Sequence, residues 1–269
     1  MSEQNPDEKL RKLVNSSGFP LQIAVAHQVD AIWHGQRWKT ILTEHPWQHP
    51  ETHDSGFIDL VIENLYRTQV MVVECKRVRD TEWTFLIPRD NPSLRTHTNN
   101  WITFIQNGNA KHFSWIDLTS DPGAFESEFC IVHGQDPKSK PMLERTASEL
   151  IDSTESLAFE EYSIQQASPD FLRIYTNVIV TTAELKICRF NPNNIDIKNG
   201  EISDAAFENV PWVRFRKCFT PRPAKLPSAK TVTEVARANE RTVFVVNSEK
   251  FIQFLSEWEL GKIPHGVFG

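Results

Sequence analysis

Two apolar runs separated by a short polar segment constrain the fold of this chain most strongly. The runs FIDLVI and QVMVVEC, within residues 56–76, are rich in the β-branched and apolar residues that are typical of strands. The polar NLYRT segment between them suits a loop of four or five residues. The pattern therefore predicts a β-hairpin over this segment.

The predicted hairpin places three charged residues on one face. If its turn is centred between positions 66 and 67, Asp59 faces Glu74 across the two strands. The side-chain period of two puts Lys76 on the same face, whereas Cys75 points to the opposite face and is expected in the core. Two carboxylates held about 5 Å apart repel unless a cation lies between them or one is protonated. We therefore expect a divalent metal ion between Asp59 and Glu74.

The alternative is that these charges simply face water, because an acidic residue fifteen positions before an E-x-K tripeptide arises often by chance. The context favours a site, since Glu74 and Lys76 end an apolar run where charge is costly unless it is solvated, paired or metal-bound. Mg²⁺ on the carboxylates would neutralise a phosphate and lower the pKa of a bound water, and Lys76 would stabilise an oxyanion. The pattern thus indicates metal-dependent phosphodiester cleavage.

Length and composition indicate a globular protein. The chain has 269 residues, of which 39% are hydrophobic, which suffices for one large domain or a domain with an appended subdomain. No apolar run approaches the ~18–20 residues that cross a bilayer, and the polar start MSEQNPDEKLRKL lacks the apolar core of a signal peptide. The four cysteines are scattered without a C-x-x-C pair. We therefore expect a cytoplasmic protein with no membrane partner.

Basic residues are concentrated in residues 210–241. This segment holds eight Lys/Arg and two Glu, which gives it a net charge of +6. Because the whole chain has a net charge of −6, the remaining residues carry −12. Within it, WVRFRK alternates apolar and basic residues at strand spacing, so its arginines share a face that could follow a phosphate backbone. A charged edge strand protected from aggregation is the alternative. The candidate nucleic-acid contacts are Arg214, Arg216 and Lys217, together with Arg77 and Arg79 after the hairpin.

The order of the remaining patterns predicts an α/β fold. Helices are expected at residues 7–15 and about 20–33, before a three-strand meander over residues 38–76. A long helix over residues 141–166, without glycine or interior proline, is predicted to cross over to a buried strand at residues 173–182. This arrangement would layer helices on a central sheet.

The predicted domain organisation is a core with an insertion and an extension. Residues 88–140 are rich in Asn, Pro, Gly and Asp and predict an irregular insertion around one or two short strands. We expect the core over residues 1–182, including this insertion. Residues 183–269 would form a C-terminal α/β extension packed on the core as one domain.

These residues, in this order, resemble the PD-(D/E)XK nuclease superfamily, which has the restriction endonuclease-like fold. GFPLQIAVAHQVDAIW at 18–33 resembles its first core helix, WKTILTEHPW at 38–47 its first strand, and FIDLVIE and VVECK its two motif strands. EWTFLIP at 82–88 resembles the strand or loop that follows E-x-K in many uncharacterised bacterial members. The resemblance covers about the first ninety residues and implies a mixed central β-sheet flanked by helices.

The resemblance also implies roles for individual residues. Asp59 and Glu74 would bind Mg²⁺ or Mn²⁺ with the backbone carbonyl of Cys75, and Lys76 would position or activate the attacking water. Many members carry a glutamate on the first helix, where this chain has Gln22, a neutral and weaker ligand that counts here among the candidate catalytic residues.

The implied function is hydrolysis of DNA phosphodiester bonds, in defence against foreign DNA or in DNA repair. The alternative, which Gln22 favours, is an inactive nuclease-like fold that binds nucleic acid or a protein. Many members dimerise to cut both strands, and this chain resembles no nucleotide-triphosphate motor. A homodimer or a helper protein is therefore a further candidate partner.

Overall fold

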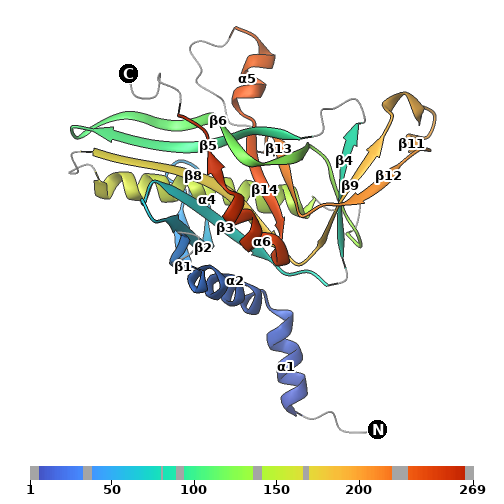
Figure 1. Cartoon of the computed structure of the whole chain (residues 1–269), viewed down its shortest axis with the longest axis horizontal. Coiled ribbons are helices and arrows are strands. Elements are labelled where there is room, and N and C mark those ends of the chain that lie inside the picture. The colour runs from blue at the N-terminus through green and yellow to red at the C-terminus, as the bar shows by residue number, and fades with distance from the viewer. Residues whose placement is uncertain are drawn as a thin grey trace.

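A large mixed β-sheet flanked by helices organises the chain (Figure 1). The computed structural model describes residues 6–32, 38–79, 81–88, 94–135, 141–165, 170–219 and 230–263. The described helices are α1 (Pro6–Ser16), α2 (Phe19–Ala31), α4 (Met142–Gln165), α5 (Val232–Ala238) and α6 (Phe251–Glu257), with the 3-10 turns η1 (Pro192–Asn194) and η2 (Ser248–Lys250). None of these described helices is long and apolar enough to span a membrane.

The large sheet has nine strands within the described residues. In order across the sheet they are β1 (Trp38–Gln48), β2 (Ser55–Asn64), β3 (Gln69–Lys76), β8 (Asp170–Thr181), β14 (Arg241–Asn247), β13 (Trp212–Lys217), β6 (Asn109–Ser127) and β15 (Glu259–Leu260), with β5 (Arg95–Gln106) pairing with both β6 and β8. The first three strands form an antiparallel meander, and β8 runs parallel to β3.

The β2–β3 hairpin has the predicted register. Leu60 pairs with Val73, and the pairing continues to Glu63 and Val70, so the turn is centred between positions 66 and 67. The side-chain oxygen of Asn64 accepts hydrogen bonds from the backbone N–H groups of Thr68, the last loop residue, at 3.0 Å and of Gln69, the first residue of β3, at 3.1 Å. This side-chain cap closes the loop and fixes the register of everything that follows on β3.

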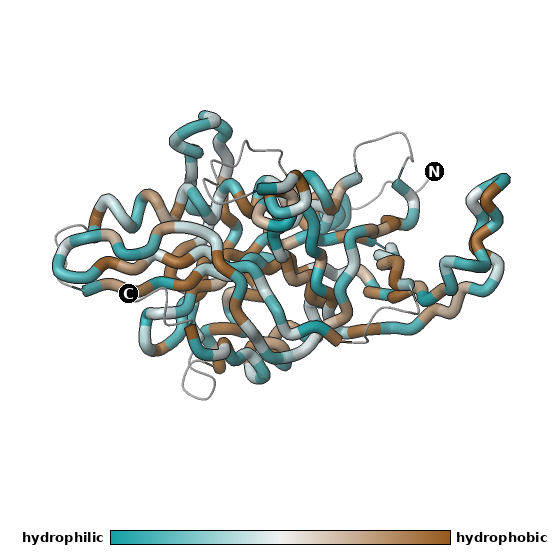
Figure 2. Tube along the Cα trace, turned by 90° about the horizontal axis from the view of Figure 1, so that it is seen from above, coloured by the Kyte–Doolittle hydropathy of each residue, from teal (hydrophilic) through white to brown (hydrophobic). Residues whose placement is uncertain are grey.

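Helices cover both faces of the meander. On one face α2 packs Val25 and Val29 against alternate residues of β2 and β3, among them Leu60. On the other face α4 contributes Leu143, Ala147, Leu150 and Ile151 to a core that includes alternate β2 and β3 residues such as Val61 and Val72. β2 and β3 are buried on both faces because successive residues along each strand are apolar, and successive side chains point to opposite faces. Figure 2 shows hydrophobic residues running through the middle of the molecule.

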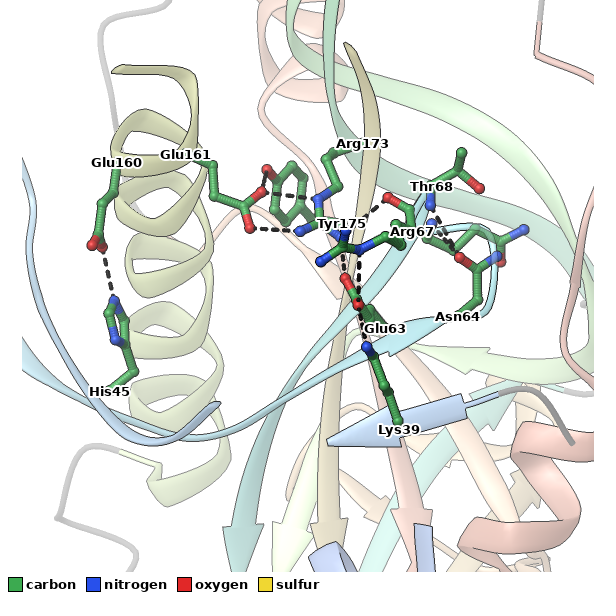
Figure 3. A network of polar contacts seen from close by, with 11 residues as sticks. Lys39, His45, Glu63, Asn64, Arg67, Thr68, Glu160, Glu161, Arg173 and Tyr175 are labelled. Atoms are coloured by element: carbon green, nitrogen blue, oxygen red, sulfur yellow. Dashed lines mark hydrogen bonds and ion pairs between the residues drawn. The ribbon is translucent and has the colours of Figure 1, made fainter. Parts of the chain in front are cut away.

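A buried ionic network fastens the C-terminal half of α4 to the sheet (Figure 3). The Glu63 side chain is only 1% exposed. Its carboxylate oxygens form ion pairs with Arg173 Nη1 at 2.8 Å and with Lys39 Nζ at 3.1 Å. Arg173 also donates through Nε and Nη2 to the two carboxylate oxygens of Glu161 on α4, and Tyr175 donates to the same carboxylate. Burial would raise the pKa of Glu63, but its bonds with Arg173 and Lys39 outweigh burial and lower the pKa. The network therefore consists of charges that are paired from several sides.

The insertion predicted at residues 88–140 contains the expected strands, but it is regular where an irregular segment was predicted. Most of it forms a long hairpin of β5 and β6, and β5 adds a strand beside β8. Three of the polar residues that suggested a loop, Thr98, Asn99 and Asn100, are buried in β5. Asn100 donates from Nδ2 to the carbonyl of Tyr175 and to the hydroxyl of Thr176. A strand whose polar side chains find buried partners does not show the apolar alternation by which strands are predicted.

Four of the remaining strands form a second, smaller sheet at one end of the molecule, and the other two form a separate pair (Figure 1). Its order is β12 (Ala206–Asn209), β9 (Glu184–Phe190), β4 (Glu82–Pro88) and β7 (Cys130–Val132), and β10 (Ile195–Asp196) pairs with β11 (Glu201–Ile202). The C-terminal strands β13 and β14 return to the large sheet, where β14 pairs with β8. The segments expected as core and as extension thus contribute to one sheet.

Candidate active site

The candidate site lies where the β2–β3 pairing ends. Continuing the observed register one step beyond Leu60 and Val73 brings Asp59 opposite Glu74. The Asp59 carboxylate accepts a hydrogen bond from the backbone N–H of Cys75 at 2.7 Å, and the Lys76 ammonium lies 2.6 Å from the Glu74 carboxylate. The structure therefore brings together the two acidic groups and the ammonium that the sequence singled out.

These three groups occupy the face of the sheet that α4 covers. Val61 and Val72, which share their strand parity with Asp59 and Glu74, pack in the core beneath α4. Cys75 packs with the α2 residues on the opposite face and is 6% exposed. Its thiol has a pKa well above the usual value, because burial and the neighbouring carboxylates oppose the thiolate. The side chain of Cys75 is therefore a core residue, as predicted.

Burial and mutual repulsion shape the protonation of the carboxylates. The pKa of Glu74 rises to about 7, first because of burial and next because of the charge of Asp59. Burial also raises the pKa of Asp59, although the Cys75 N–H bond opposes the shift. For Lys76, burial would lower the pKa, but Glu74 and Asp59 outweigh it and raise the pKa. The ammonium of Lys76 therefore does not fully offset the cost of ionising Asp59 and Glu74.

The donor set fits a hard divalent cation that uses few protein ligands. Asp59 and Glu74 supply carboxylate oxygens, and Mg²⁺ takes one or two carboxylates and retains waters. The carbonyl of Lys76 accepts from the N–H of Thr182 beyond β8, so the peptide groups of Cys75, one residue earlier, point to the β2 side where Asp59 lies. Within the described residues, no cluster of three or more His, Cys, Asp or Glu side chains is arranged to hold a metal. The fit is therefore to a site of two carboxylates and a carbonyl.

Gln22 reaches the site through the backbone. It is 6% exposed on α2, and its Nε2 donates to the main-chain carbonyl of Asp59 at 2.7 Å. This bond comes from the helix on the face opposite the carboxylates, because α2 packs with the Cys75 side. Gln22 therefore holds the β2 backbone at Asp59, a positioning role, and the amide nitrogen that makes this contact is not a metal ligand.

A pocket of about 450 Å³ opens beside Glu74. One wall comes from the end of β1 and the start of β2, with Trp47 and Phe57, and the other from α4, with Arg145 and Glu149. The charge of Glu149 raises the pKa values of Glu74 and Lys76 as a lesser cause. Sequence reasoning missed these residues.

The predicted nucleic-acid contacts divide into two groups. Arg77 and Arg79 follow β3 directly and are half-buried and exposed, respectively. Arg214, by contrast, is fully buried over the ring of Phe244, and burial lowers its pKa to about 10. Its side chain is not available to a phosphate backbone, which corrects the prediction for this residue.

The other β13 cations are engaged within the protein. Arg216 pairs with Asp117 and Glu240, and Lys217 lies 3.5 Å from Glu144. β13 lies between β14 and β6 and is not an edge strand, so the alternative of a charged edge is also wrong. The alternation in WVRFRK correctly indicated a strand. Because this strand is covered on both faces, however, the residues that alternate onto either face are buried, including the first arginine. The proline-rich residues 221–229 lie outside the described residues.

Comparisons with models of protein families, with curated proteins and with solved structures found no match for this chain.

Proposed function

We propose that the protein is a metal-dependent nuclease that hydrolyses DNA phosphodiester bonds at Asp59, Glu74 and Lys76. The observation that carries the proposal is the juxtaposition of two carboxylates and an ammonium at the end of the hairpin, with the Glu74 pKa raised to about 7. Perturbed carboxylates at the edge of a pocket are typical of functional sites. A divalent cation would relieve the repulsion that perturbs them.

The order of elements supports the family on which the proposal draws. Helix α2 precedes the β1–β2–β3 meander, and α4 then leads to β8, which pairs parallel to β3 along its whole length. This is the succession of helix, three strands, helix and buried strand expected from the resemblance to PD-(D/E)XK nucleases. The insertion of the β5–β6 hairpin between β3 and α4 enlarges the sheet without interrupting that succession.

The chemistry follows from what each side chain can do. When bound, Mg²⁺ or Mn²⁺ would neutralise the scissile phosphate and lower the pKa of a coordinated water. Asp59 and Glu74, with the carbonyl of Cys75, would hold the cation. Lys76 places a compact positive charge beside Glu74, where it can stabilise the attacking or developing oxyanion. Arg79, exposed just beyond β3, would contact a neighbouring phosphate.

A second candidate function is a nuclease-like fold that binds nucleic acid or a protein without cleaving it. The observation that favours it is the neutral Gln22, which bonds the Asp59 backbone and adds no charge to the metal site. Weaker metal binding follows from fewer carboxylates. The two candidates differ in whether the site binds Mn²⁺ and whether metal supports cleavage.

A cleavage assay tests the proposal. Supercoiled, linear and single-stranded DNA would be incubated with Mg²⁺ or Mn²⁺ and the wild type, Glu74→Gln or Lys76→Met. The matched controls are Glu201→Gln and Lys198→Met, at exposed positions in and beside the β10–β11 strands. We expect cleavage by the wild type and controls, and a loss of about 100-fold or more in both site variants. Equal cleavage by all the proteins would contradict the proposal, and Mn²⁺ binding without cleavage would favour the second candidate.

A further inference from the structure

The pocket beside Glu74 has the size of a small-ligand site. Its volume of about 450 Å³ lies within the range of roughly 300–1,000 Å³ found for small-molecule pockets. A pocket of this size accommodates a group no larger than a small molecule and not a double helix. The pocket is nevertheless continuous with the candidate active site, because Glu74 is one of its lining residues.

The β1–β2 wall of the pocket is aromatic. Phe57 lines the pocket and is 63% exposed. Trp47, its neighbour in the wall, lies so close to Gly56 that a Cβ there would come within 3.2–3.3 Å of the indole. Glycine at position 56 thus lets the indole rest against the backbone. The exposed ring of Phe57 and the indole of Trp47 offer aromatic surface at the edge of the charged site.

The α4 wall of the pocket is polar. Arg145, Ser148 and Glu149 line it from successive turns of the helix, and Asp54 lies at its β2 side. Together they present a guanidinium donor, a hydroxyl and carboxylate acceptors opposite the rings. Aromatic rings on one side and hydrogen-bonding groups on the other match a nucleobase, which has two π-faces and a polar edge. The acidic residues disfavour a second phosphate in the pocket itself.

We infer that this pocket receives one unpaired nucleotide adjacent to the scissile phosphate, with its base against Phe57. The inference rests on the proposed function and names its substrate class: single-stranded, frayed or bulged DNA. A base within an intact duplex reaches the pocket only after leaving the stack, which costs unstacking and unpairing energy. Binding therefore discriminates between unpaired and paired DNA before any cleavage occurs.

A binding assay without metal tests the inference independently of catalysis. The full chain in EDTA would be titrated with a fluorescein-labelled single-stranded 12-mer, the same 12-mer as a blunt duplex, and single-stranded 12-mers carrying one abasic position at each step along the sequence. Fluorescence anisotropy gives each affinity. The variants are Phe57→Ala, with Phe207→Ala as its control at an equally exposed position on β12 in the smaller sheet, and Ser148→Trp, which fills the pocket from α4.

We expect the single strand to bind more tightly than the duplex, and one abasic position to weaken it. Phe57→Ala and Ser148→Trp should each lower the affinity by about fivefold or more, the lower end of the loss for one base–aromatic stack, with Phe207→Ala unchanged. Equal affinities for duplex, single strand and abasic strands, or wild-type affinity in both pocket variants, would overturn the inference. Metal-dependent cleavage could still be observed in that case, so the proposed nuclease function would not be contradicted. Conversely, base-dependent binding without any cleavage would support the nucleotide pocket and contradict the proposed nuclease activity.

Discussion

Replacing Glu74 by glutamine should stabilise the metal-free protein at neutral and alkaline pH. The pKa of Glu74 is about 7 in the folded protein, against an ordinary value of 4.5. Each pKa unit corresponds to about 1.4 kcal/mol, so ionising Glu74 in the folded state costs about 3 kcal/mol. The ion pair with Lys76 opposes the shift and is already included in this value. Only 17% of the Glu74 side chain is exposed, so little solvent screening reduces the cost.

The pH window follows from the direction of the shift. Between pH 4.5 and 7 the folded protein keeps the Glu74 proton that the unfolded chain has lost, so the free energy of unfolding falls as pH rises through this window. Glutamine carries no proton to lose. The variant should therefore exceed the wild type by only about 1 kcal/mol at pH 5 and by about 3 kcal/mol at pH 8.

Urea denaturation measures this difference. Tryptophan fluorescence would follow unfolding in EDTA at intervals from pH 5 to pH 8.5, with Glu201→Gln as a control that removes an exposed carboxylate on β11. We expect the gain to grow with pH in Glu74→Gln and to be absent in the control. A gain of the same size at pH 5 and pH 8, or no gain at pH 8, would refute the reasoning that the ionised Glu74, buried and beside Asp59, destabilises the fold.

The same structural reasoning gives three further predictions. Mn²⁺ at 100 times its dissociation constant should stabilise the wild type by about 2.7 kcal/mol, measured by thermal unfolding, and should leave Glu74→Gln unchanged; equal shifts would place the metal elsewhere. Arg173→Ala should cost about 3 kcal/mol in urea denaturation, because Glu63, 1% exposed, loses its 2.8 Å partner and keeps Lys39, and a loss under 1 kcal/mol would contradict this. Arg214→Met should leave the salt dependence of DNA binding unchanged, whereas Arg79→Ala should reduce its slope by about one; the reverse result would show that the buried arginine becomes accessible.

The hairpin was predictable because every constraint on it is local. Apolar runs on either side of a short polar loop fix two strands, and the side-chain period of two then determines which residues share a face. The Asn64 cap and the pairing of Leu60 with Val73 show why a turn centred between positions 66 and 67 was sufficient. The position of Asp59 opposite Glu74 follows from the register alone.

Features that depend on tertiary partners were not predictable in the same way. β5 was predicted only as a short strand, because its polar residues, such as Asn100, are buried only once β8 supplies their hydrogen-bond partners. Arg214 was misassigned because alternation identifies its face but not that another layer covers that face. Glu149 could not be singled out, because which polar side of α4 faces the hairpin depends on how the helix packs.

The two sides of β3 explain how the fold tolerates a repelling carboxylate pair. On the β8 side, β3 is paired at every residue from Gln69 to Lys76. On the β2 side, the regular pairing stops at Val73, and the next available N–H, that of Cys75, is satisfied by the Asp59 carboxylate instead of a backbone carbonyl. The strands can therefore separate at the carboxylates while β8 keeps β3 in place. A polar opening is created without a loss of register, which is what the proposed nuclease site would require to admit a cation and a phosphate.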